Sequence, residues 1–143
     1  MLNDLYREVI LQHYQSPRNR RPLDNPDLEG SAQNPLCGDE ITIFASVAEG
    51  LLADVAFQAR GCSISQASAD IMADALRGKT LPEALGAISE FEHLMQDDEP
   101  GDVEHPEDLQ ALRSVRRFPV RVKCALLPWV TLGEAIDRYR ADQ

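Results

Sequence analysis

The chain has 143 residues, 43% of them hydrophobic, and its formal net charge is −10. This length and apolar content predict a single domain over residues 1–143 with a packed core. The acidic balance disfavours nonspecific nucleic-acid binding, which needs a basic surface, and no apolar run is long enough to predict a membrane span. The N-terminus has neither the basic start nor the cleavage site of a secretory signal, so we expect a cytoplasmic protein.

The N-terminal quarter predicts one helix followed by a loop. Apolar residues recur at helical spacing over residues 3–14, and Ser16-Pro17 ends that helix. Residues 16–36 contain four prolines and a glycine, which predicts a loop with room for a short strand near residues 28–33.

A β-hairpin is predicted next. Alternating apolar residues cover roughly 40–48 and 52–60, and Glu49-Gly50 offers a tight turn between them. The alternation is imperfect, because Phe44 and Phe57 add bulk on the side expected to be polar. Helices that partly cover one face of the hairpin explain such a pattern.

The rest of the chain predicts helices. They are expected between Cys62 and Gly78, from Thr80 to about Met95, over residues 107–114, and from about residue 122 to 141 after the break at Pro119. Thr80 and Glu83 form a capping box, and the segment with Pro100, Gly101 and Pro106 predicts a loop. The predicted fold is therefore α+β, a small antiparallel sheet of about three strands with helices packed on one face.

Charge is unevenly distributed near the last predicted helix. Residues 90–108 hold nine acids and no Lys or Arg, whereas residues 113–123 hold five basic residues and no acid. So sharp a change of sign is consistent with an ordinary solvated surface or with a docking face for a charged partner.

The three cysteines are the main candidates for chemistry. An odd number in a reduced compartment disfavours a disulfide framework and leaves buried thiols, a reactive thiol or metal ligands. Each one lies at a predicted junction: Cys37 in a turn before the hairpin, Cys62 between strand and helix, and Cys124 near the start of the last helix. A helix N-terminus favours the thiolate, which is the form that binds metal and attacks sulfur.

Asp39 offers a fourth ligand if the three cysteines converge. Zinc takes four tetrahedral ligands of N, S or O type, and Asp39 follows Cys37 by two residues. Arg121 and Lys123 would moderate the negative charge of such a site if they lie near it in space. Asp39 is equally compatible with an ordinary turn aspartate, and the chain has no CxxC pair to strengthen the zinc reading.

The three cysteine contexts together resemble one known family. Asn34-Pro35-Leu36-Cys37-Gly38-Asp39, Gly61-Cys62-Ser63 and Cys124 are similar to the motifs of the U-type scaffold family of iron–sulfur cluster assembly, which includes IscU, SufU and the N-terminal part of NifU. Tyr6-Arg7-Glu8 and Ser16-Pro17-Arg18-Asn19 also match. The resemblance covers essentially the whole chain, and one departure is Arg21-Pro22-Leu23, where many members have a glycine before the leucine.

Two features resemble the SufU branch in particular. Lys123 precedes Cys124 where IscU members carry a histidine, and a segment of roughly twenty residues is added around 97–117. The resemblance implies a zinc site of Cys37, Asp39, Cys62 and Cys124. It also implies that the protein accepts persulfide sulfur from a SufS-like cysteine desulfurase, stimulates that enzyme, and serves a downstream iron–sulfur assembly scaffold.

The hypothesis from sequence is thus a zinc-dependent sulfurtransferase in which Cys37 attacks the persulfide and Arg121 orients it. One alternative is a scaffold on which a [2Fe–2S] cluster is assembled and transferred, with iron in place of zinc. Another is an interaction domain with a structural zinc. We expect His13 to be packed or to face a partner, His93 and His105 to be solvated, and Trp129 and Leu132 to lie in the core.

Overall fold

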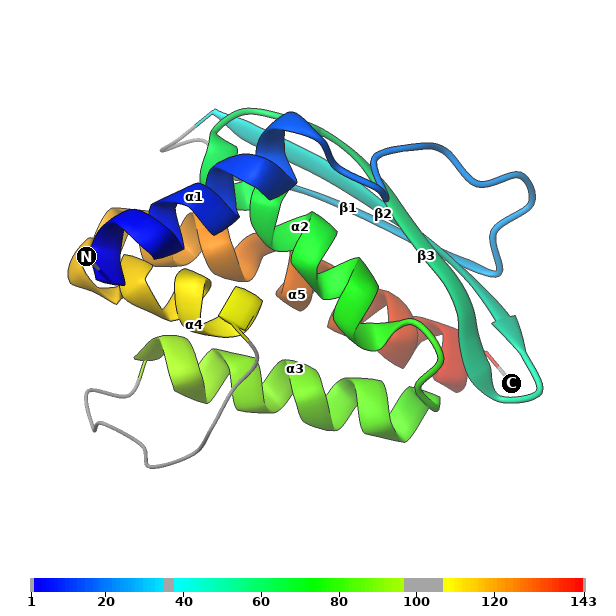
Figure 1. Ribbon diagram of the computed structural model, residues 1–143. Helices are drawn as coiled ribbons and strands as arrows, with labels where there is room; N and C mark the ends of the chain where they lie inside the picture. Colours follow the sequence, from blue (N-terminus) through cyan, green and yellow to red (C-terminus); the bar gives the residue numbers. More distant parts are fainter. Residues whose placement is uncertain (1, 35–37, 97–106, 143) are drawn as a thin grey trace.

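The computed structural model describes residues 2–34, 38–96 and 107–142, with the side chains of residues 2–6 and 107 excepted. Its elements follow one another along the chain as the sequence predicts (Figure 1). They are α1 (Leu2–Gln15), β1 (Leu28–Asn34), β2 (Asp39–Ala48), β3 (Leu51–Arg60), α2 (Ser63–Leu76), α3 (Leu81–Gln96), α4 (Glu107–Arg113), the 3₁₀ turn η1 (Ser114–Arg117) and α5 (Pro119–Ala141).

The three strands form one antiparallel sheet in the order β1-β2-β3. The predicted hairpin is confirmed, and Glu49 and Gly50 both take positive φ values of 54° and 77°, as a tight hairpin turn requires. The prediction for Phe57 is wrong. The register shifts between Ser46 and Val47, and Phe57 pairs with Ile43 on the core side, where it is 1% exposed. A one-residue shift reverses the face of every following side chain.

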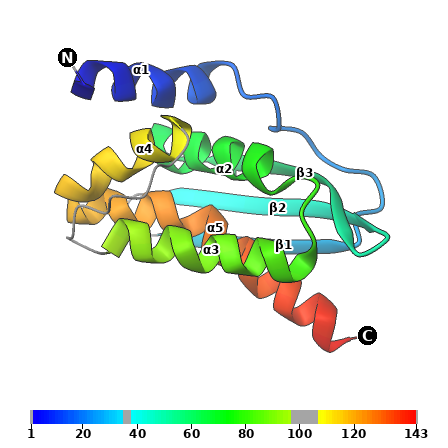
Figure 2. The ribbon, with the colours of Figure 1, turned by 60° about the horizontal axis from the view of Figure 1, so that its bottom comes forward.

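Helices cover one face of this sheet, which confirms the predicted α+β class (Figure 2). Helix α5 packs on β1 and β2, and α2 packs on β3 and on α5. Helix α3 lies against α5, whereas α1 lies against α2 and α4. Among the described residues, no helix combines the length and apolarity that a bilayer crossing requires.

The core lies between the sheet and these helices. Trp129 stacks on Phe91 with ring centroids 4.1 Å apart, and its indole N–H donates to Ser68 Oγ at 2.9 Å. Leu132 is fully buried. The core positions predicted for Trp129 and Leu132 are therefore confirmed, and Ser68 supplies the partner that a buried indole needs.

Helix boundaries follow local signals with one difference. The capping box is present, because Glu83 accepts from Thr80 N–H and Thr80 Oγ1 accepts from Glu83 N–H. The last helix begins at Pro119, three residues before the predicted start. Proline is well suited to the first helical position, where its missing N–H needs no partner. The predicted acidic loop with Pro100, Gly101 and Pro106 lies outside the described residues, as does His105, while His93 is exposed as expected.

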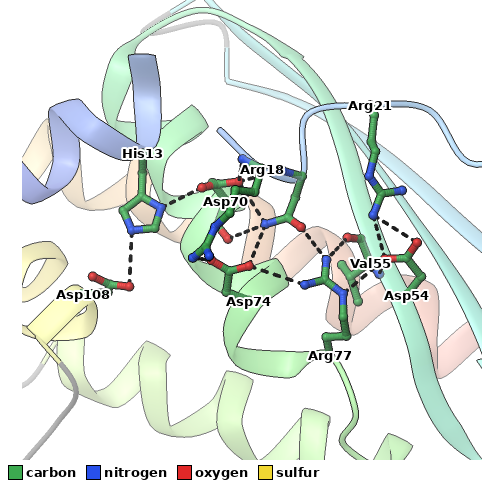
Figure 3. Close-up of polar contacts among 10 residues, drawn as sticks. His13, Arg18, Arg21, Asp54, Val55, Asp70, Asp74, Arg77 and Asp108 are labelled. Atoms are coloured by element: carbon green, nitrogen blue, oxygen red, sulfur yellow. Dashed lines mark hydrogen bonds and ion pairs between the residues drawn. The ribbon is translucent and has the colours of Figure 1, made fainter. Parts of the chain in front are cut away.

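A polar network ties α1 to the rest of the fold (Figure 3). His13 Nδ1 lies 2.6 Å from Asp70 Oδ2 and its Nε2 lies 3.3 Å from Asp108 Oδ2. The other Asp70 oxygen accepts from the backbone N–H groups of Arg18 and Asn19 and from the Asn19 amide. His13 is thus packed, as expected, and its partners on α2 and α4 hold the helix in place.

His13 and Asp70 shift each other's pKa through their hydrogen bond. The hydrogen bond to Asp70 is the largest cause and raises the pKa of His13 above its usual 6.5, although burial acts the other way. Burial acts to raise the pKa of Asp70, but the bonds from His13 and Asn19 outweigh it and place the value below 3.8. A group whose folded pKa is raised stabilises the fold below its unfolded pKa and loses that contribution as pH rises through the folded value.

Replacement of His13 by Gln is expected to destabilise the protein most between about pH 5 and 6.5, by about 1–3 kcal/mol for a lost charged hydrogen bond. The difference from the native chain should shrink as pH rises from 6.5 through the raised pKa of folded His13, because the ion pair loses its positive charge there. Urea unfolding of both proteins across pH 5–9 checks this. His93→Gln, at an exposed position on α3, is the matched control. A destabilisation by His13→Gln that does not change with pH would contradict the assigned ion pair.

Candidate functional site

Three of the four residues proposed as metal ligands converge at one end of the sheet. Asp39 begins β2, Cys62 lies between β3 and α2, and Cys124 lies on α5. One ligand atom from each lies within 4.8 Å of the other two. Residues separated by up to 85 positions in the chain thus present one carboxylate and two sulfurs to a common point.

Asp39 and Cys62 are joined by direct hydrogen bonds. Asp39 Oδ1 accepts from the Cys62 backbone N–H at 2.7 Å, and Asp39 Oδ2 lies 3.6 Å from Cys62 Sγ. Asp39 is 1% exposed. A buried carboxylate is costly unless hydrogen bonds compensate it, so the Cys62 N–H fixes where this carboxylate can lie.

Gly61 makes that approach possible. Its φ is +124°, a conformation that residues with a Cβ rarely adopt. A Cβ at this position would lie 2.3 Å from Asp39 Oδ1 and 2.7 Å from Asp39 Cα. The glycine therefore lets the backbone of the β3–α2 junction lie directly against Asp39.

Cys62 is the N-cap of α2. Its side chain accepts from Ser65 N–H at 3.5 Å, which is the contact that a Ser or Asp makes at other helix starts. A sulfur at this position faces free backbone N–H groups and the positive end of the helix dipole.

Cys124 does not share that environment. Because α5 begins at Pro119, Cys124 is beyond the first turn, whose N–H groups are the free ones. The expectation that all three cysteines sit at helix or loop starts is wrong for this residue. Cys124 is fully buried, and its Sγ lies 3.8 Å from the Val120 carbonyl oxygen.

The other predicted site residues are placed less directly. Cys37 lies outside the described residues, although Gly38 beside it has φ +70°. Arg121 and Lys123 are exposed. Within the described ranges, neither side chain makes a hydrogen bond or ion pair with Asp39, Cys62 or Cys124. Arg121 shares a cavity with Ser63 and Ile64, which directly follow Cys62.

The donor set fits zinc. Zinc–sulfur bonds of about 2.3 Å and zinc–oxygen bonds of about 2.0–2.2 Å in a tetrahedron place neighbouring ligand atoms about 3.5–3.8 Å apart. The Cys62–Asp39 separation of 3.6 Å already lies in this range. Two sulfurs and one oxygen leave one tetrahedral position for a further ligand.

A second group, His13, Asp70 and Asp74, also brings three ligand atoms within 4.8 Å. Its carboxylates are already neutralised, because Asp74 bonds to Arg18 and Arg77 and Asp70 bonds to His13. A cation would have to displace these partners. This group is therefore a structural ion-pair network, and the sequence did not predict it because His13 lies more than 50 residues from Asp70 and Asp74.

This chain is thus a small α+β domain in which the hairpin, the β3–α2 junction and α5 bring one carboxylate and two cysteines together at a candidate metal site. Residues 5–143 match the NifU-like N terminal domain family, and the chain belongs to that family.

Related proteins of known name cover nearly the whole chain. It is 39% identical over 137 residues to the zinc-dependent sulfurtransferase SufU of Bacillus subtilis, covering 96% of this chain and 92% of that one. It is 36% identical to the iron–sulfur cluster assembly scaffold protein IscU of Streptococcus pyogenes serotype M1, covering 96% and 86%.

A solved structure shares the fold as well. The crystal structure of a putative iron–sulfur cluster assembly scaffold protein for the SUF system, from Fervidobacterium islandicum AW-1, superposes with a TM-score of 0.80 at 32% identity. The match covers 93% of this chain and 97% of that one. The predicted SufU-type resemblance is thereby confirmed at the level of family and fold.

Substitution of Gly61 by Ala tests the site's packing. We expect a loss of at least about 2 kcal/mol in the free energy of unfolding, because the methyl group strains the backbone and meets Asp39. Gly86→Ala on α3 is the control, since a Cβ there meets no atom within 4 Å and removing a helical glycine stabilises by about 0.5–1 kcal/mol. Chemical denaturation of both metal-free variants measures the difference, and a Gly61→Ala protein as stable as the native chain would refute the close approach.

Proposed function

We propose that this chain is a zinc-dependent sulfurtransferase of iron–sulfur cluster assembly. It accepts persulfide sulfur from a SufS-like cysteine desulfurase, stimulates that enzyme, and passes sulfur to a downstream assembly scaffold. The family and the names of its relatives support the role in iron–sulfur assembly. One observation above all supports the assignment as a zinc-dependent sulfurtransferase. The buried carboxylate of Asp39 lies against Cys62, in the place that a further thiolate would take in a site built from cysteines alone.

The proposed metal ligands are Cys37, Asp39, Cys62 and Cys124. When bound, zinc keeps its cysteine ligands as thiolates and adds no redox chemistry of its own. A carboxylate is a harder ligand than a thiolate and exchanges more readily. Asp39 therefore distinguishes this site from closed structural sites built from Cys and His, which is why the reading as an interaction domain with a structural zinc is less well supported.

The transfer step uses the Cys37 sulfur as nucleophile. Its thiolate attacks the outer sulfur of the desulfurase cysteine persulfide. A new S–S bond forms at Cys37, the S–S bond of the desulfurase breaks, and the desulfurase cysteine leaves as a thiolate. Gly38, with its positive φ, gives the adjoining backbone a conformation closed to most residues. The exposed Arg121 guanidinium is the group that orients the incoming donor.

A cluster scaffold is the second candidate, and a specific observation favours it. IscU scaffold proteins are 36% and 35% identical to this chain over most of its length, and the same thiolates and carboxylate can ligate iron. Lys123 favours the sulfurtransferase, because it stands where the IscU branch places a histidine beside the third cysteine.

Labelled sulfur tests the proposal. The zinc-loaded protein is incubated with the desulfurase and ³⁵S-cysteine, and peptide mass spectrometry locates the added sulfur. We expect one sulfur on Cys37, background transfer to Cys37→Ser, and native transfer to Ser31→Ala, an exposed hydroxyl on the far face of the sheet.

Full transfer to Cys37→Ser would refute the assignment of that residue. Protein prepared without air that contains iron and sulfide, absorbs visible light and accepts no label would instead identify the scaffold function.

A further inference from the structure

The peptide group between Gly61 and Cys62 is held at both of its polar ends. Its N–H, which belongs to Cys62, donates to Asp39 Oδ1 at 2.7 Å. Its carbonyl, which belongs to Gly61, accepts from Gln66 Nε2 at 3.2 Å. Because a peptide group is planar and rigid, the side chain of Gln66 is linked through it to the candidate ligand Asp39.

Gln66 is a buried amide with partners at both ends. It lies near the start of α2 and is 6% exposed. Its Oε1 accepts from Arg20 Nη1 at 2.9 Å, while its Nε2 donates to the Gly61 carbonyl. Burial of an amide is costly unless hydrogen bonds replace those to water. These two bonds therefore fix the orientation of the Gln66 side chain.

The backbone alone does not fix the direction of the Gly61–Cys62 peptide. Gly61 has a φ of +124°, and glycine moves between positive and negative φ at little cost because it has no Cβ. Gly61 is also exposed, so packing around it places little restraint on its backbone. Rotation of the peptide plane would turn the Cys62 N–H away from Asp39, and the bond from Gln66 opposes that rotation.

The hydrogen bonds run in one direction from a cation to an anion. Arg20 donates to Gln66, and Gln66 donates to the Gly61 carbonyl. The same peptide then donates to the Asp39 carboxylate. Hydrogen bonds in such a chain polarise one another, so each donor becomes stronger. The positive charge of Arg20 thereby acts on Asp39 through two intervening groups.

This arrangement also distinguishes the two oxygens of Asp39. Oδ1 accepts from the Cys62 N–H, whereas Oδ2 lies 3.6 Å from Cys62 Sγ. Carboxylates that ligate metals are themselves held by hydrogen bonds, and loss of such a partner typically costs about 10–100-fold in metal affinity. Gln66 holds the partner of Oδ1, which leaves Oδ2 as the oxygen that faces the sulfur.

We propose that Gln66 is a positioning residue for the metal site. It holds the Gly61–Cys62 peptide so that Asp39 presents Oδ2 to the ion. The assignment rests on the proposed function, because it requires Asp39 to be a ligand. Gln66 acts through the peptide and is not itself a ligand.

Two substitutions separate the bond to Gly61 from the packing of the Gln66 side chain. Gln66→Met keeps the length and approximate volume of the side chain and removes both hydrogen bonds. Gln66→Glu keeps an acceptor for Arg20, but an ionised carboxylate has no N–H for the Gly61 carbonyl. Both variants are expected to fold, because Gly61 and Arg20 are exposed and water can replace the lost partner. Gln12→Met, at an exposed glutamine on α1, is the matched control.

Zinc affinity is measured by competition with a chromophoric chelator, and deuterium exchange at the Cys62 amide is measured by NMR at saturating zinc. We expect both Gln66 variants to bind zinc about 10–100-fold more weakly than the native chain and to exchange the Cys62 amide faster. Added negative charge by itself attracts a cation, so weaker binding by Gln66→Glu reports lost positioning. Gln12→Met should match the native chain in both measurements.

A purely structural role gives a different result. If the Gln66 variants unfold at lower urea concentration but keep native zinc affinity and native exchange at the Cys62 amide, the assignment is overturned and the proposed function stands. It is also overturned if Gln66→Glu behaves like the native chain while Gln66→Met does not, because the bond to Gly61 is then not the cause. If the native chain binds no zinc and accepts no labelled sulfur, the proposed function fails and this assignment fails with it.

Discussion

The hydrogen bond between the Cys62 N–H and the Asp39 carboxylate is the contact on which the site depends. It is 2.7 Å long and joins the start of β2 to the start of α2. A carboxylate that is 1% exposed needs such a donor, and the donor can reach it only because Gly61 has no Cβ. The bond therefore sets the distance between a carboxylate oxygen and a cysteine sulfur, and α5 then brings Cys124 to the same point.

Local sequence signals predicted much of this architecture. The capping box at Thr80 and the turn at Glu49-Gly50 depend on neighbours within three residues, so a single sequence contains the information. The face of Phe57 was predicted wrongly, because a register shift between β2 and β3 is a property of paired strands. The His13–Asp70 contact joins residues 57 apart, and nothing in either neighbourhood indicates the other.

The candidate site was predictable for a different reason. The spacing of the three cysteines alone is compatible with buried thiols as well as with metal ligands. It is also compatible with Asp39 as an ordinary turn residue. The resemblance of three separate motifs to one family selected the ligands. The structure brings Asp39, Cys62 and Cys124 within 4.8 Å of one another. It also corrects the environment of Cys124, which is buried in α5 beyond the helix start. Of the two described cysteines, Cys62 is therefore the one at a helix N-terminus.

Sulfur transfer and cluster assembly make different demands on the same donor set. A scaffold must hold iron and sulfide together, whereas a sulfur acceptor must expose one thiolate to a protein persulfide. The exposed Arg121, which shares a cavity with Ser63 and Ile64 beside Cys62, suits the second task. Lys123, in the place of a histidine, also favours it.

The coordination of the bound metal is the most direct test of this account. X-ray absorption at the zinc edge, on protein prepared without air, reports the number and type of ligands. The account predicts three sulfurs at about 2.3 Å and one oxygen at about 2.0–2.2 Å, with the oxygen lost in Asp39→Ala. A native zinc site that contains no carboxylate oxygen, or one unchanged by Asp39→Ala, would contradict it.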